Sequence, residues 1–204
     1  INNLTKYFLF SLSLLTACCN ISIAQLNWNQ AGKFNGSTQP YTYLAIPSAS
    51  EFNDVDECMY ELWVYMLSYP NSTYYQFFNK DLDYQIAYDW FSGVYVRNIN
   101  SSGADLDGPT LSLNRWYHLA VVIRDTNIVS SPNSKVRELY IDGVLNVKDV
   151  QQYSGGTLGN GPDSIKVGSY GGPNFLGTLN GYIDDVRMWL GKFYPDDVGR
   201  NFRT

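Results

Sequence analysis

Few residues of this 204-residue chain are suited to nucleophilic or metal chemistry. The only histidine is His118, and a nucleophilic site would place it in a cleft beside a carboxylate and a serine or cysteine. It stands instead in the middle of the strand-like run 116–124, so we expect a structural histidine. Cys58 is the only cysteine outside the first 24 residues, and one His with one Cys falls short of an ordinary zinc site.

Cys58 itself is predicted to be inert. It lies in the strand-like run 57–64 and is flanked by Glu57 and Glu61. A reactive thiolate is favoured by basic neighbours, and these neighbours are carboxylates. We therefore expect a small buried hydrophobic residue at this position.

Aromatic side chains close to turns are the main candidates for ligand contact. Phe, Trp and Tyr make up 16% of the chain. Binding sites combine such rings with a few polar groups, and sugars stack their apolar C–H faces on exposed rings while Asn, Asp and Gln bind the hydroxyls. Each ring is alternatively a core or interface residue. The predicted ligand contacts are Tyr74, Tyr75, Trp90, Tyr95 and Tyr170.

Composition bounds the class of protein. Charged residues are only 16% of the chain, which together with the aromatic content excludes intrinsic disorder. The formal net charge of −5 argues against a nucleic-acid partner, which would require a basic face.

The first 24 residues are predicted to be a secretory signal peptide. Lys6 precedes a short apolar run, too short to span a bilayer of roughly 30 Å, and Ser22-Ile23-Ala24 supplies the small residues of a cleavage site. The mature domain would then comprise residues 25–204.

Two other interpretations of this segment stay open. Leu15-Thr16-Ala17-Cys18 resembles the lipobox of bacterial lipoproteins, in which Cys18 would be lipidated, and an uncleaved anchor is the third possibility. We expect a secreted, extracellular or cell-surface protein, with the membrane as a partner only if Cys18 is lipidated or the segment is retained.

The remaining chain reads as strands separated by turns, which predicts an all-β fold. Asp142-Gly143 divides the run 138–147 and suits a type I′ hairpin turn. Residues 195–202 predict a short C-terminal helical turn. Nine or more strands at short spacing indicate an antiparallel two-sheet sandwich or jelly roll. The predicted strands cover 41–46, 60–66, 74–78, 84–91, 93–97, 116–124, 138–147, 164–168 and 181–189, and the predicted exposed loops are 98–108, 126–134 and 154–164.

Five motifs occur in one order and carry a family resemblance. They are Phe34-Asn35-Gly36 with Tyr43-Leu44-Ala45-Ile46-Pro47, Tyr60-Glu61-Leu62-Trp63-Val64, Trp116-Tyr117-His118-Leu119-Ala120, Leu139-Tyr140-Ile141-Asp142-Gly143, and Gly181 to Trp189. Together they resemble laminin-G-like modules of the concanavalin A-like lectin and glucanase superfamily over residues 32–202. The resemblance implies a jelly roll of two antiparallel sheets packed face to face, one of them curved.

The glucanases of that superfamily use a Glu-x-Asp-x-x-Glu motif, and this chain lacks it. Asp81-Leu82-Asp83 and Asp105-Leu106-Asp107 each place two carboxylates on one side of the chain, without a third acid. We therefore expect no enzyme but a secreted module that binds glycan through rim loops. The alternatives are a cell-adhesion or spacer module of a larger surface protein that contacts protein, and an unusual carbohydrate-active enzyme.

Asp184 is the candidate metal ligand. The superfamily often binds a structural calcium through an aspartate at this place in the closing strand, together with backbone carbonyls of the opening strand. The resemblance thus implies a calcium site at Asp184, with the carbonyls near Asn35 and Gly36 as partners. The alternative is that Asp184 and Asp185 pair with Arg187 or with water.

The pattern of the same strand predicts an irregularity. Ile183, Val186 and Met188 cannot share one face under strict alternation, because the interval from 183 to 186 is odd. A β-bulge near Asp184 would restore the register and free backbone carbonyls from the ladder. A carboxylate beside freed carbonyls suits a hard cation.

Overall fold

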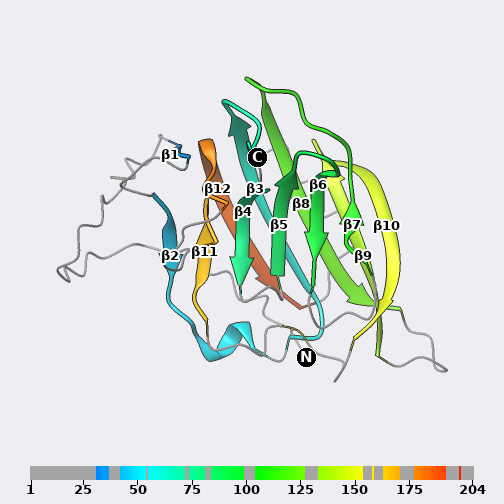
Figure 1. Cartoon of the computed structure of the whole chain (residues 1–204). Coiled ribbons are helices and arrows are strands. Elements are labelled where there is room, and N and C mark those ends of the chain that lie inside the picture. Colours follow the sequence, from blue (N-terminus) through cyan, green and yellow to red (C-terminus); the bar gives the residue numbers. More distant parts are fainter. Residues whose placement is uncertain are drawn as a thin grey trace.

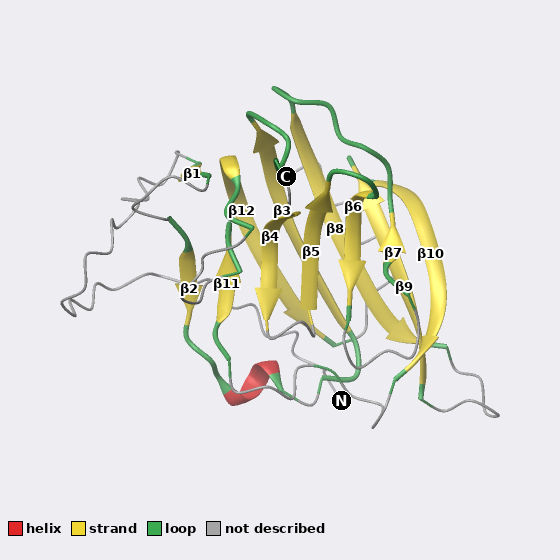
Figure 2. Cartoon of the chain, in the orientation of Figure 1, coloured by secondary structure: helices red, strands yellow, loops and turns green. Residues whose placement is uncertain are grey.

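The structure is a computed structural model, and it describes residues 31–36, 42–53, 55–71, 74–80, 84–98, 104–126, 133–153, 158, 163–170, 177–191 and 198. Within these residues it contains strands, one short 3-10 turn, η1, and a single helical residue, Val198 (Figure 2). The elements are β1 (Gly32–Asn35), β2 (Leu44–Ile46), η1 (Ser50–Phe52), β3 (Cys58–Met66), β4 (Tyr74–Lys80), β5 (Tyr84–Asp89), β6 (Gly93–Arg97), β7 (Leu106–Asp107), β8 (Trp116–Asp125), β9 (Ser134–Ile141), β10 (Val144–Gln152), β11 (Ile165–Val167) and β12 (Asn180–Leu190).

The strands form two antiparallel sheets. Sheet A has the order β1-β12-β3-β8-β9-β10, and sheet B has the order β2-β11-β4-β5-β6-β7. Figure 1 shows the strands of sheet B lying in front of those of sheet A. The predicted all-β, two-sheet sandwich is thus confirmed.

Alternating side chains of the two sheets form the core between them. In β3, Tyr60, Leu62 and Val64 are fully buried and belong to the core cluster. The Tyr60 ring stacks on Phe78 of sheet B, with ring centroids 5.1 Å apart. Burial of each such side chain contributes roughly 1.5–3 kcal/mol, so the contact between the sheets is the main source of stability.

The predicted hairpin joins β9 to β10. Asp142 and Gly143 both have positive φ, 52° and 75°, as a type I′ turn requires. The Asp142 carboxylate also accepts a hydrogen bond from the backbone N–H of His118 at 3.0 Å, and the Asp142 N–H donates to the His118 carbonyl at 2.8 Å. The turn is therefore fixed to the neighbouring strand β8.

Two predicted loops are shorter than expected. The stretch 98–108 contains β7, whose Leu106 and Asp107 pair with Val96 and Tyr95. The stretch 126–134 ends at Ser134, which already belongs to β9. A two-residue strand has no recognisable alternation, so its pairing comes from the neighbouring strand.

Some expectations concern residues outside the described part of the chain. The predicted signal segment, residues 1–24, lies wholly outside it. Of the predicted C-terminal helical turn only Val198 is described, and it is helical and buried. Among the described residues, no helix combines the length and apolar character that a membrane crossing requires.

Candidate functional site

The outer face of sheet B carries an ordered array of aromatic and polar side chains. In β5 the even-numbered residues enter the core, so Gln85, Ala87 and Asp89 point outward. The neighbouring strands follow the same rule. We call this outer surface the front face, and its members are Tyr74, Gln76, Asn79, Gln85, Ala87, Asp89, Tyr95, Arg97, Asp107 and Lys166.

Strand pairing aligns the front face in three rows across the sheet. The first row joins Tyr74 to Asp89, the second runs Gln76, Ala87, Tyr95, Asp107, and the third runs Lys166, Asn79, Gln85, Arg97. Neighbouring strands are about 4.8 Å apart, and alternate residues of a strand are about 7 Å apart. The solvent-accessible members of the front face are Tyr74, Asp89, Arg97, Asp107 and Lys166, whereas Gln76, Asn79, Gln85, Ala87 and Tyr95 are at most 3% exposed.

Two buried amides of the front face have unused hydrogen-bonding capacity. Gln76 and Gln85 are 0% exposed, and within the described residues neither amide nitrogen nor amide oxygen of either has a hydrogen-bond partner. A buried polar group left unpaired costs about 1–3 kcal/mol, and native proteins contain few. Each amide offers both donors and an acceptor, which is the capacity that a hydroxyl group requires.

Carboxylates gather at the β7 side of the front face. Arg97 donates through Nε and Nη2 to the two carboxylate oxygens of Asp105, at 2.8 and 2.6 Å. Asp107 is exposed, but partial desolvation by its neighbours raises its pKa, and the nearby carboxylates of Asp105 and Asp89 raise it further, against the opposing effect of Arg97. The carboxylates of Asp89, Asp105 and Asp107 and the guanidinium of Arg97 are therefore close enough to interact electrostatically.

Three of the five predicted ligand contacts lie on or beside the front face. Tyr74 is partly exposed, and Tyr95 lies beneath the Arg97 guanidinium, 5.2 Å from the ring centroid. Burial raises the pKa of the Tyr95 hydroxyl, which keeps it neutral. Tyr170 follows β11, and its ring lies 5.7 Å from Lys166 Nζ.

Trp90 lies in the turn between β5 and β6. The side chain of Asp89 accepts hydrogen bonds from the N–H groups of Phe91 and Ser92, which fixes this turn. Trp90 is 58% exposed, and its ring contacts the ring of Tyr69 edge-on at 6.1 Å. Tyr69 in turn stacks on the core residue Tyr88, so the exposed indole lies on the inner side of the sheet edge and not on the front face.

Tyr75 is placed differently. It is buried in the core, and its hydroxyl lies 3.0 Å from Ser68 Oγ and 3.2 Å from the carbonyl oxygen of Tyr69. Tyr75 and Tyr74 are neighbours on one strand, so they point to opposite sides of the sheet. We leave Tyr75 out of the candidate site for this reason.

The bulge predicted in the closing strand is present. The register of β12 against β3 shifts between Asp184 and Arg187, and Asp185 has a positive φ of 50°. Asp184 is exposed, and its Oδ1 accepts the N–H of Asp185 at 2.8 Å. Asp185 itself pairs with Arg187, as the alternative interpretation had it.

The structure does not bring Asp184 next to the other two predicted calcium ligands. Asn35 pairs with Asn180, four residues before Asp184, which corresponds to roughly 13 Å along the strand. The N–H of Gly36 donates to the Leu179 carbonyl near the same end. No group of three or more His, Cys, Asp or Glu side chains in the described residues is arranged to hold a metal ion. Calcium at Asp184 stays a prediction.

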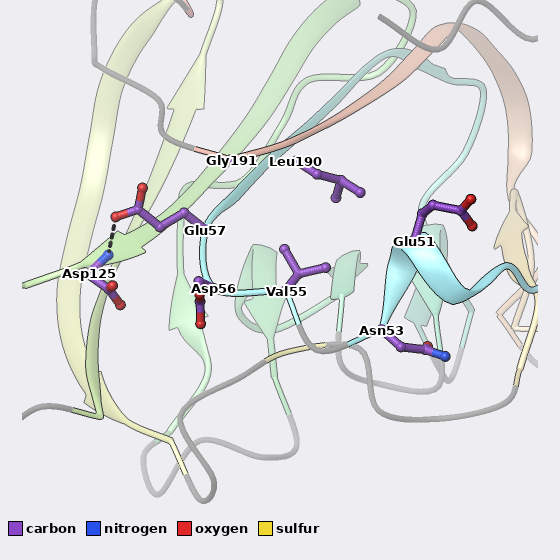
Figure 3. A pocket seen from close by; sticks show the side chains of 8 residues that line it. All are labelled: Glu51, Asn53, Val55, Asp56, Glu57, Asp125, Leu190 and Gly191. Carbon is purple, nitrogen blue, oxygen red and sulfur yellow. Dashed lines mark hydrogen bonds between the residues drawn. The ribbon is translucent and has the colours of Figure 1, made fainter. Parts of the chain in front are cut away.

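A separate pocket of about 360 Å³ lies at the edge of the sandwich (Figure 3). The carboxylate of Glu57 accepts the N–H of Asp125 at 3.0 Å, and Lys135 Nζ pairs with Asp125 at 2.7 Å. These contacts join the ends of β3, β8 and β9. The pocket is lined by Glu51, Asn53, Val55, Asp56, Glu57, Asp125, Leu190 and Gly191.

His118 and Cys58 are buried, as the sequence predicted. His118 is 1% exposed, packs its ring against Trp63 at 5.3 Å, and lies 3.2 Å from a carboxylate oxygen of Glu61 through Nε2. Cys58 is fully buried, and burial raises the pKa of its thiol far above the ordinary value. Neither residue lies on the front face.

Sequence reasoning missed the polar members of the front face. Gln76 and Gln85 are ordinary polar residues within aromatic runs, and nothing in the sequence distinguishes a paired amide from an unpaired one. The alternation of apolar and polar residues over Tyr84–Asp89 was a usable signal, since it places Gln85 and Asp89 on one side of the strand.

The order and pairing of the strands define an antiparallel two-sheet sandwich. The chain belongs to the Laminin_G_3 family of the concanavalin A-like lectin/glucanases superfamily, whose family model matches residues 35–199. The resemblance inferred from five short motifs is thereby confirmed.

Solved structures of the same fold include proteins with different activities. Domain 4 of an extracellular GH43 arabinanase from Geobacillus stearothermophilus, solved with arabinotriose, is 20% identical with a TM-score of 0.54, over 83% of this chain and 75% of that one. The SAP-like pentraxin of Limulus polyphemus is 14% identical with a TM-score of 0.57, over 82% and 78%. Trypanosoma rangeli sialidase is 11% identical with a TM-score of 0.61, over 84% of this chain and only 27% of the sialidase. No curated protein matches the chain.

Proposed function

We propose that this module binds carbohydrate on the front face of sheet B and carries out no catalysis. The observation that carries the proposal is the partly exposed ring of Tyr74, on the same sheet face as the buried amides of Gln76 and Gln85, which have no hydrogen-bond partner among the described residues. Rings supply surfaces for the C–H faces of a sugar, and amides supply donors and acceptors for its hydroxyls.

The comparisons support this class of ligand at a coarser level. The arabinanase domain was solved with an oligosaccharide, and this chain shares its fold. Fold alone does not fix function, so the proposal depends on the side chains of the front face. Its location differs from the rim loops expected from the sequence, and much of those loops lies outside the described residues. The predicted signal segment leads us to propose that the module acts outside the cell.

Binding to polysaccharides tests the proposal. Affinity electrophoresis against arabinan, galactan, β-glucan and xylan should show retardation in at least one gel, and calorimetry would then give the dissociation constant. Tyr74→Ala should weaken this binding about tenfold or more, because it removes a partly exposed ring of the front face.

Tyr182→Ala is the matched control. Tyr182 lies in β12 of sheet A and packs edge-on against Tyr65, away from the front face. The Tyr182→Ala variant loses the same type of side chain as Tyr74→Ala and should bind the polysaccharide as tightly as the wild type. Equal losses of affinity in Tyr74→Ala and Tyr182→Ala would place the binding site outside the front face. Absence of retardation in every gel would favour the alternative of an adhesion module that contacts protein.

A further inference from the structure

The charges of the front face bear on which glycans it accepts. Asp107 is exposed and lies in the second row, directly beside Tyr95. Asp89 lies in the first row beside Tyr74. The positive charge of Arg97 is bound in two hydrogen bonds to Asp105, so it is already matched by a carboxylate.

The described part of the front face has one other cation, Lys166, at its opposite edge. Lys166 pairs with Asn79 in the third row, whereas Asp107 lies on the last strand of the sheet. Four strand spacings separate β11 from β7, which is about 19 Å. This exceeds the screening length of about 8 Å at physiological salt, so Lys166 does little to offset the carboxylates.

We propose that the front face selects uncharged glycans and rejects glycans that carry carboxylate or sulfate groups. The proposal rests on the proposed function and names the ligand class for the same site. An anionic sugar at Tyr74 would meet Asp89 at close range and Asp107 in the neighbouring row, whereas a hydroxyl can donate a hydrogen bond to either carboxylate.

The buried amides are a second, independent observation that points to the same ligand class. Gln76 and Gln85 are uncharged, and each can both donate to and accept from a hydroxyl. A site for an anion would instead place unpaired cations or several backbone N–H groups at this position. Polar capacity whose one cation without a carboxylate partner among the described residues, Lys166, lies at the far edge is suited to neutral sugars.

The test compares one polymer in two charge states. Galactan and β-glucan are each used as such and after oxidation of their C6 hydroxyls to carboxylates, so that backbone and linkage stay the same. The wild-type protein should bind the oxidised polymer about tenfold more weakly than the native one at low salt. This difference should fall below about twofold in 1 M NaCl, where the screening length is about 3 Å.

Two variants assign the effect to the front face. Asp107→Asn should narrow the difference between the two polymers to about threefold, because it removes one carboxylate next to Tyr95. Glu51→Gln changes the net charge by the same amount on an exposed residue of η1, outside the front face, and it should leave the tenfold difference intact.

The outcomes separate this inference from the proposed function. Binding of native galactan or β-glucan, with equal or tighter binding of its oxidised form, overturns the inference and leaves carbohydrate binding standing. Equal effects of Asp107→Asn and Glu51→Gln overturn the assignment to the front face. Absence of binding to arabinan, galactan, β-glucan and xylan and to the oxidised polymers overturns both proposals together.

Discussion

Gly93 begins β6 next to the front face, and its replacement by alanine should destabilise the protein strongly. Its φ is +81°, and a Cβ at this position would lie 2.5 Å from the carbonyl carbon and oxygen of Pro109 and 2.8 Å from the Thr110 nitrogen. All three are backbone atoms, so no side-chain rotation relieves the contact. The Pro109 segment must move away from β6.

The free energy of unfolding that Gly93→Ala loses follows from backbone strain and from two broken hydrogen bonds. An alanine with left-handed backbone costs about 1–2 kcal/mol. Movement of the segment breaks the bonds from the Val94 N–H to the Pro109 carbonyl, at 3.0 Å, and from the Gly108 N–H to the Val94 carbonyl, at 2.7 Å. Each contributes about 0.5–1.5 kcal/mol. The sum is about 2–5 kcal/mol, which lowers the melting temperature by roughly 5–15 °C in a domain of this size.

Gly36→Ala is the control for strain alone. Gly36 has a similar φ of +67°, but a Cβ there would meet the side chain of Asn180 at 3.2 Å and no backbone atom closer than 3.8 Å. We expect a loss of about 1–2 kcal/mol for Gly36→Ala in urea unfolding and a clearly larger loss for Gly93→Ala. Equal losses in the two variants would refute the argument that the Pro109 backbone is fixed against Gly93.

Three other predictions concern charges. The pKa of Asp107 is raised in the folded state, so its contribution to stability is fully present below the unfolded pKa of about 3.9 and is lost as the pH rises through the folded pKa. Asp107→Asn should therefore raise the melting temperature more at pH 7 than at pH 3. A lower melting temperature of the variant at pH 7 would contradict this. Glu61 is 2% exposed and lies between His118 and Arg187. Glu61→Ala should lower the free energy of unfolding in urea by about 3–5 kcal/mol. A loss below 1 kcal/mol would show that the contacts of Glu61 with these two residues are dispensable. If calcium binds at Asp184 and the β12 bulge, calcium at a hundredfold excess over Kd stabilises the folded protein by about 2.7 kcal/mol. A chelator should then lower the melting temperature of the wild type by roughly 5–10 °C and leave that of Asp184→Ala nearly unchanged. Equal responses of the two proteins would refute the site.

The sequence alone determined the fold class and several local structures. Alternation and turn residues predicted most strands of the sandwich, because side chains on one face of a strand must be apolar to form a core. Asp142-Gly143 predicted the hairpin, since few other dipeptides accept two positive φ values. The odd interval between Ile183 and Val186 predicted the bulge for an equally local reason. Each of these depends on neighbours in the chain.

Only the tertiary structure decided which residues form the candidate site. Strand β4 has aromatic residues on both faces, so its sequence cannot show that Tyr75 enters the core while Tyr74 points outward. Pairing registers between strands then placed Tyr95 in the row of Gln76, and set Asp184 four positions away from the partner of Asn35. A register is fixed by the packing of two sheets and not by either strand alone, which is why the sequence could name the rings but not assemble the face.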